Sequence, residues 1–131
     1  MENIFIKRTE RTPQIEFDFT KNVFALRGES YPEDVPTFFG PPISALQKHL
    51  ENLSSGNIEF YFELVYFNST SAKVIMKLFE LLDETAQNGV SVTILWCFDP
   101  DDDNMQEMGE EFGEDLQVAQ IKMCPVKSTT P

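Results

Sequence analysis

The ten residues Ile58–Phe67, with the sequence IEFYFELVYF, decide the fold. Aromatic and branched side chains favour a pleated strand, and Glu59 and Glu63 alternate with them near its start. Successive side chains of a strand point to opposite faces. One face would therefore carry only apolar side chains: Phe60, Phe62, Leu64 and Tyr66. This pattern predicts a strand whose apolar face lies in the core of the protein.

Strands and helices alternate after this segment. The polar positions of residues 70–88 recur at helical spacing and leave a wide apolar face, and Gly89 is the residue type that ends a helix. Residues 90–98 are apolar at nearly every position from Ile94 onward, as in a strand that is covered on both faces. A short helix over 104–112 and a strand over 117–123 follow. This alternation predicts a sheet with parallel pairs.

The N-terminal half predicts one helix and one hairpin. Pro41 and Pro42 suit the first turn of a helix that runs to Leu53. Strands over 14–19 and 23–27 would form a hairpin with a three-residue loop. The predicted fold is a single α/β domain over residues 1–131, with a mixed β-sheet and packed helices, and a loose tail at about 125–131.

Composition excludes several classes of function. The chain has 131 residues, enough for one domain, and a net charge of −12, which argues against binding to nucleic acid or an anionic membrane. No apolar run reaches transmembrane length, and the chain start lacks secretory features, so we expect a cytoplasmic protein. Cys97 and Cys124 have neither zinc nor redox spacing, and Cys97 is expected in the core. The single histidine, His49, is expected on the surface, and no catalytic motif or cofactor site is present.

The junction Asn68-Ser69-Thr70-Ser71 joins the central strand directly to the next helix. Small polar residues are preferred helix N-caps, and we expect the Ser69 hydroxyl to cap a helix that begins near Thr70. The same position favours added negative charge, so a phosphate placed there would gain backbone donors, with Lys73 one turn away. The sequence leaves both a structural cap and a phosphorylation site open.

An acidic segment follows the strand over 90–98. Its acids occupy positions 1, 3, 5 and 12 of a calcium loop: Asp99, Asp101, Asp103 and Glu110. Position 6 is Asn104 instead of glycine, and a strand precedes the segment where a calcium loop has a helix. The other interpretation is an acidic helix N-terminus. A divalent-metal binding module is therefore the competing function.

The chain resembles the SiaC family of bacterial biofilm-regulation phosphoproteins over nearly its whole length, and four segments carry this resemblance. They are Thr12-Pro13-Gln14-Ile15, Gly28-Glu29-Ser30-Tyr31-Pro32-Glu33, residues 66–73 with the sequence YFNSTSAK, and Trp96 with the acidic run after it. The second and third blocks, in this order and spacing, are the specific ones. The family is similar, more distantly, to STAS-type anti-sigma-factor antagonists, which implies a STAS-like fold.

The resemblance implies a partner-switching protein without enzyme activity. A Ser/Thr protein kinase would phosphorylate it, a PP2C-type phosphatase would reverse this, and the unphosphorylated form would bind and activate a diguanylate cyclase, raising cyclic-di-GMP. The modified residue of the family follows the Asn and is often Thr, which implies Ser69 here, with Thr70 as the second choice. The residues expected at the partner surface are Tyr31, Pro32, Glu33, Asn68, Ser69, Thr70, Ser71 and Lys73.

Overall fold

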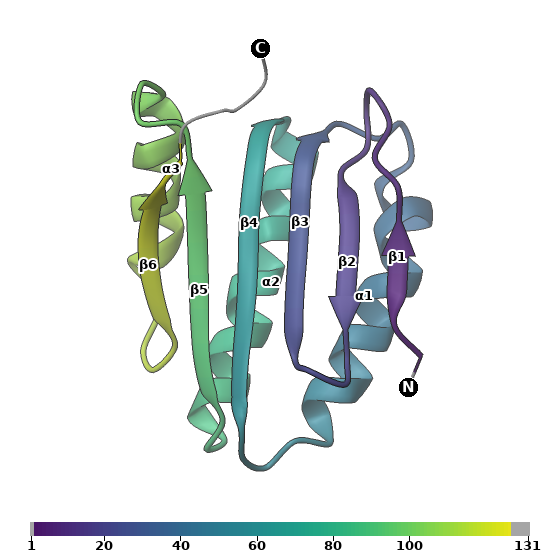
Figure 1. Cartoon of the computed structure of the whole chain (residues 1–131), viewed down its shortest axis with the longest axis vertical. Helices are drawn as coiled ribbons and strands as arrows, with labels where there is room; N and C mark the ends of the chain where they lie inside the picture. Colours follow the sequence, from purple (N-terminus) through teal and green to yellow (C-terminus); the bar gives the residue numbers. More distant parts are fainter. Residues whose placement is uncertain (1, 127–131) are drawn as a thin grey trace.

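The computed structural model describes residues 2–126 and contains one six-stranded sheet and three helices (Figure 1). The strands are β1 (Ile4–Ile6), β2 (Gln14–Asp18), β3 (Val23–Ser30), β4 (Asn57–Phe67), β5 (Ser91–Phe98) and β6 (Gln120–Pro125). The helices are α1 (Val35–Glu51), α2 (Ser69–Gln87) and α3 (Asp103–Gly113). The predicted loose tail begins too early, because Pro125 ends β6; residues 127–131 lie outside the described part of the chain.

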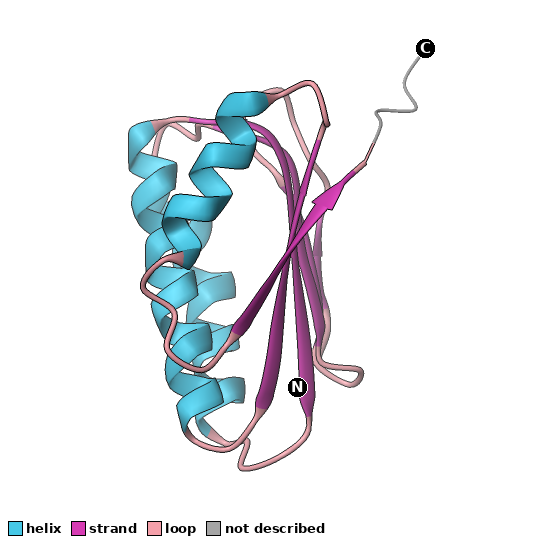
Figure 2. Ribbon diagram, turned by 90° about the vertical axis from the view of Figure 1, so that its left-hand side faces the viewer, coloured by secondary structure: helices cyan, strands magenta, loops and turns pink. Residues whose placement is uncertain are grey.

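The strands lie side by side in chain order. The first three pair antiparallel, and β3 through β6 pair parallel, each parallel step being connected by a helix. All three helices cover the same face of the sheet, and the opposite face carries none (Figure 2). The predicted α/β fold, a mixed sheet with packed helices, is confirmed.

The core lies between the sheet and the helices. The apolar face of β4 supplies its centre, because Phe60, Phe62 and Leu64 are at most 4% exposed. The Phe62 ring lies 5.2 Å from that of Phe79 in α2 and 5.6 Å from that of Trp96 in β5. The side chains of the predicted hairpin strand that were expected on one face, Ile15, Phe17 and Phe19, are also buried. The predicted apolar face of β4 is thus confirmed as far as Leu64.

The start of α1 differs from the prediction. The helix begins at Val35, with the Asp34 carboxylate accepting from the Thr37 backbone N–H at 3.2 Å. Pro36 occupies the first turn, whereas Pro41 and Pro42 lie inside the helix. A proline has no N–H to donate, so the proline pair leaves two helix carbonyls without an intrahelical donor. The predicted helix start at Pro41 and Pro42 is therefore wrong: Asp34 caps the helix, and Pro36 is the proline of its first turn.

The expectation that His49 lies on the surface is wrong. Its ring is half-buried, packs edge-on against Phe19 with 5.0 Å between centroids, and its Nε2 is 2.6 Å from the side-chain oxygen of Asn22. Asn22 is the last residue of the β2–β3 turn and has a positive φ of 56°. His49 therefore ties α1 to the hairpin turn, and burial lowers its pKa.

The helix-free face of the sheet carries a charged cluster. The Arg27 guanidinium pairs with Glu16 at 2.7 Å and with Glu63, and it lies over the Tyr61 ring. Three neighbouring strands are thus linked across this face.

Within residues 2–126, no helix combines the length and the apolar character that crossing a lipid bilayer requires.

Candidate functional site

The junction between β4 and α2 is capped by Asn68, not by Ser69. Helix α2 begins at Ser69, and the Asn68 side-chain oxygen accepts from the Ser71 backbone N–H at 2.9 Å. The same oxygen accepts from the Thr70 hydroxyl at 3.0 Å. The helix starts one residue before Thr70, close to the predicted start, but the predicted Ser69 cap is wrong, because the Asn68 oxygen already accepts a free N–H group of the first turn.

The three hydroxyl groups of this junction have different environments. Ser71 is 1% exposed, and its Oγ is 2.8 Å from the Oγ of Ser30. Thr70 is exposed, but its hydroxyl is engaged by Asn68. Ser69 is exposed and its hydroxyl has no hydrogen-bond partner within residues 2–126. Of the three, Ser69 is the one that a modifying enzyme could reach without breaking a contact.

The two specific sequence blocks meet at this junction. Strands β3 and β4 are parallel, so their carboxyl ends lie at the same end of the sheet, at the top of Figure 1. The Asn68 backbone N–H donates to the Ser30 carbonyl at 3.2 Å. The Tyr31 ring packs edge-on against the Tyr66 ring, with 5.8 Å between centroids. Residues more than thirty positions apart in the sequence therefore lie side by side next to Ser69.

The residues expected at a partner surface fall into three groups by exposure. Pro32 and Ser71 are buried, so their own side chains offer little accessible surface to a partner. Glu33 is exposed and pairs with Arg11 at 2.5 Å, and Lys73 is exposed one turn into α2 without an ion pair among the described residues. Tyr31 and Asn68 are half-buried, and Ser69 and Thr70 are exposed.

A β-bulge in β4 exposes two further residues beside the site. Gly28 pairs with Leu64 and Glu29 with Tyr66, so Val65 is the extra residue of β4. A bulge shifts the alternation of side chains by one position. Val65 is 68% exposed and Tyr66 is 49% exposed, which corrects the expectation that Tyr66 shares the buried face of β4. The half-buried Tyr31 packs against the Tyr66 ring, and these three residues are here called the apolar patch.

The acidic segment borders this patch. Val65 lines the same shallow depression as five residues of this segment: Asp99, Asp101, Asp102, Asp103 and Asn104. Asp102 caps α3 by accepting from the Met105 backbone N–H at 3.0 Å, and Asp99 accepts from the Asp101 N–H. Helix α3 already begins at Asp103, which places Glu110 two turns inside it. Within residues 2–126, no group of three or more His, Cys, Asp or Glu side chains is arranged to hold a metal ion.

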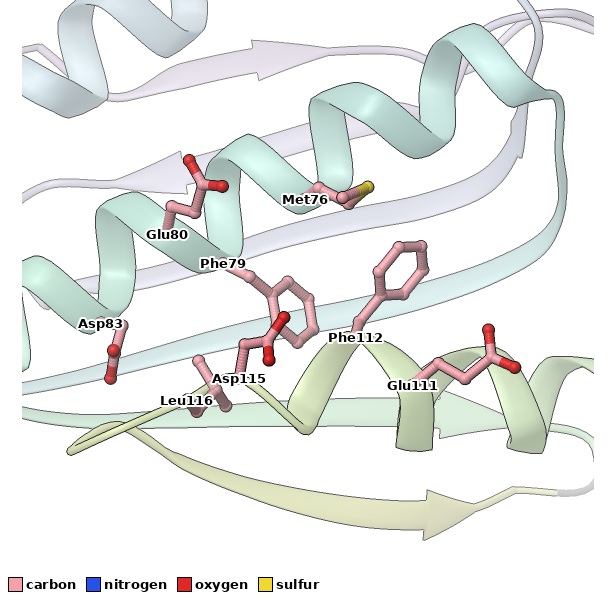
Figure 3. A pocket seen from close by; sticks show the side chains of 8 residues that line it. All are labelled: Met76, Phe79, Glu80, Asp83, Glu111, Phe112, Asp115 and Leu116. Carbon is pink, nitrogen blue, oxygen red and sulfur yellow. The ribbon is translucent and has the colours of Figure 1, made fainter.

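A separate cavity of about 130 Å³ lies between α2 and α3 (Figure 3). The rings of Phe79 and Phe112 form its floor, and the carboxylates of Glu80, Glu111 and Asp115 stand around it. Asp83 lines it too but is only 7% exposed. None of the residues predicted for the partner surface or the calcium loop lines this cavity.

Asp83 holds the segment between α3 and β6. Its carboxylate accepts backbone N–H groups of Gln117, Val118 and Ala119 at 2.9–3.1 Å. Burial alone would raise the pKa of Asp83, but these hydrogen bonds and one from Gln87 outweigh burial, and its pKa is lowered. Because residues 117–119 bind Asp83, they do not pair in the sheet, and β6 begins at Gln120 instead of the predicted 117.

Replacing Asp83 with Ala should lower the free energy of unfolding by about 2–3 kcal/mol, because three backbone donors lose a charged acceptor. Glu84→Ala, on the exposed side of the same helix, should change it by less than about 0.5 kcal/mol. Since the folded-state pKa of Asp83 is depressed, its contribution is present at neutral pH and is lost as the pH falls through that pKa. Urea denaturation at pH 7 and at pH 3 measures both effects. An Asp83→Ala cost that did not shrink at pH 3 would contradict this role.

Comparison with known proteins links this chain to a family. The model of the family described as SiaC family regulatory phosphoprotein matches residues 6–126. An uncharacterised protein of Pseudomonas aeruginosa (strain UCBPP-PA14) is 32% identical over 115 residues, which cover 88% of this chain and 90% of that protein.

Two crystal structures are similar to the whole fold. Apo-SiaC from Pseudomonas aeruginosa superposes with a TM-score of 0.85 and is 31% identical, covering 95% of this chain and 99% of its own. The second structure is the complex of the diguanylate cyclase SiaD with its activator SiaC, from the same organism. One of its chains superposes with a TM-score of 0.88 and is 29% identical, covering 94% of this chain and 99% of its own.

Proposed function

Because the chain belongs to the SiaC family of regulatory phosphoproteins, we propose that it is a non-enzymatic switch that binds and activates a diguanylate cyclase. In its unphosphorylated form it raises cyclic-di-GMP in the cytoplasm and thereby acts in biofilm signalling. A Ser/Thr protein kinase adds a phosphate to Ser69, and a PP2C-type phosphatase removes it. The pairing of SiaD with its activator SiaC supports a cyclase as the partner class.

The observation that carries the proposal is the environment of the Ser69 hydroxyl. It is exposed at the first residue of α2, beside the apolar patch of Tyr31, Val65 and Tyr66. A partner that covers this patch would bring its own apolar surface close to Ser69. Thr70, the second choice, is less suited because its hydroxyl is already donated to Asn68.

Phosphorylation would change this surface without unfolding it. The phosphate adds about −1.5 to −2 charges at neutral pH, and the free N–H groups and dipole at the start of α2 favour negative charge there. A partner that packs on the patch would have to desolvate this charge at a cost of several kcal/mol, unless it supplied a cation. The nearby acids of residues 99–103 add further negative charge. Phosphorylation therefore releases the partner.

The test compares three forms of the full chain in binding to a diguanylate cyclase from the same organism. Unmodified protein should bind and raise the rate of cyclic-di-GMP synthesis, and so should the Ser69→Ala variant. Homogeneous Ser69-phosphorylated protein should bind at least about 100-fold more weakly, which corresponds to roughly 2.7 kcal/mol. Calorimetry and a cyclase assay give both readings.

Protein phosphorylated at Thr70 is the matched control for this experiment. If Ser69-phosphorylated protein bound as tightly as the unmodified form and the Thr70 form did not, the acceptor would be Thr70. If no cyclase bound any form, the partner class itself would be wrong.

A further inference from the structure

The two cysteines lie opposite each other on neighbouring strands. Cys97 of β5 pairs in register with Cys124 of the edge strand β6, and neither takes part in a disulfide. The sequence could not indicate this, because 27 positions separate them and no short spacing motif is present. The parallel pairing of β5 and β6 brings the two cysteines next to each other, although they are far apart in the sequence.

The geometry of this pair suits a disulfide. Neighbouring strands lie about 4.7–4.9 Å apart, and a disulfide joins residues whose Cα atoms are about 4.4–6.8 Å apart. Residues in register also point to the same face of the sheet. Here that is the face without helices, because Trp96 and Phe98, the neighbours of Cys97, contact the core cluster on the other side.

The two thiols lie on paired positions of neighbouring strands but differ in exposure. Burial and a hydrogen bond with the Cys124 thiol raise the pKa of Cys97 to about 12. Cys97 is 5% exposed, whereas Cys124 is half-buried on the outermost strand. A small oxidant would therefore meet Cys124 first, and Cys97 is the nearest thiol that could follow.

We propose that Cys97 and Cys124 form a redox modification site that reacts with hydrogen peroxide and closes to an intramolecular disulfide. The Cys124 thiolate attacks one peroxide oxygen, the O–O bond breaks, and a sulfenic acid forms while the leaving oxygen departs as water after taking a proton. The Cys97 sulfur then attacks the Cys124 sulfur, the S–O bond breaks, and a second water leaves with the Cys97 proton. Two thiols are oxidised and one peroxide is reduced to two waters.

This site is separate from Ser69 and goes beyond the proposed function. The disulfide would close a loop over residues 97–124 that contains the acidic segment and all of α3. It would also fasten the edge strand to its neighbour. A dithiol reductant would reverse the reaction by thiol–disulfide exchange.

The test treats the full chain with hydrogen peroxide and measures its intact mass and its peptide map. Closure removes two hydrogens, about 2 Da, and joins the peptides of Cys97 and Cys124, and dithiothreitol should restore both thiols. Disulfide-linked dimers, or stable oxidation of Cys124 without a cross-link, would overturn the proposal. This result needs no variant and so does not depend on the folding of one.

Two variants test the order of the steps. Cys97→Ser should accumulate a Cys124 sulfenic acid that dimedone traps, because the second thiol is missing. Cys124→Ser should react with peroxide and dimedone at least about tenfold more slowly, since the remaining thiol is buried and its pKa is raised. Equal trapping in both variants would contradict the assignment of Cys124 as the first thiol to react.

Discussion

The variant Phe62→Ala should lose about 3–5 kcal/mol of unfolding free energy, as truncation of a buried aromatic side chain does. Phe62 is 1% exposed at the middle of β4, and its ring contacts Phe60, Phe79 and Trp96. These rings come from β4, α2 and β5, so the lost packing affects the whole interface between sheet and helices. Removing the ring leaves a cavity that rigid neighbours cannot close. Urea denaturation followed by circular dichroism measures the loss.

Phe5→Ala is the matched control, because it removes the same kind of ring from an exposed position of a strand. Phe5 is 65% exposed on the edge strand β1. Its truncation should cost less than about 1 kcal/mol. A cost below about 1 kcal/mol for Phe62→Ala as well would mean that β4 is not the centre of the core.

The sequence predicts the fold well where a periodic pattern covers a whole element. The alternation in β4 and the helical spacing in α2 identify both elements, and their order indicates parallel strands. Boundaries were predicted less well, because local signals compete. The proline pair at 41–42 resembles a helix start, but the cap at Asp34 begins α1 earlier. Strand β1 has only three residues, too few for a periodic pattern to predict it.

The candidate site was predicted only in outline, because its details depend on neighbouring strands. The bulge at Val65 is a property of the pairing between β3 and β4, so the sequence of β4 alone placed Tyr66 on the wrong face. Ser71 of α2 forms its hydrogen bond with the hydroxyl of Ser30, which lies at the end of β3. No local pattern could therefore distinguish the buried hydroxyl from the exposed ones. The dithiol of Cys97 and Cys124 was missed for the same reason.

The variant Ser71→Asp should be the most damaging single change at the junction, costing about 3–5 kcal/mol, because it buries a charge without a partner cation. Ser71 is 1% exposed, and its hydroxyl contacts only Ser30 among the described side chains. The α2 dipole would offset part of this cost, by no more than about 1 kcal/mol for an ordinary position in the first turn. Thermal unfolding followed by circular dichroism measures the loss.

Two control variants identify the cause of this loss. Ser69→Asp introduces the same charge at an exposed position, and Ser71→Ala removes the Ser71 hydrogen bond without introducing a charge. Ser69→Asp puts the same carboxylate two residues earlier, where the side chain is exposed, so the free energy of unfolding should change by less than about 1 kcal/mol. Ser71→Ala removes only the buried hydrogen bond and should cost about 1 kcal/mol. If Ser71→Asp were as stable as Ser69→Asp, the hydroxyl of Ser71 would be accessible to a kinase, and exposure could no longer favour Ser69 as the phosphorylated residue. If the expected order holds, only Ser69 and Thr70 can carry a phosphate on the folded protein, and the contact between Thr70 and Asn68 favours Ser69.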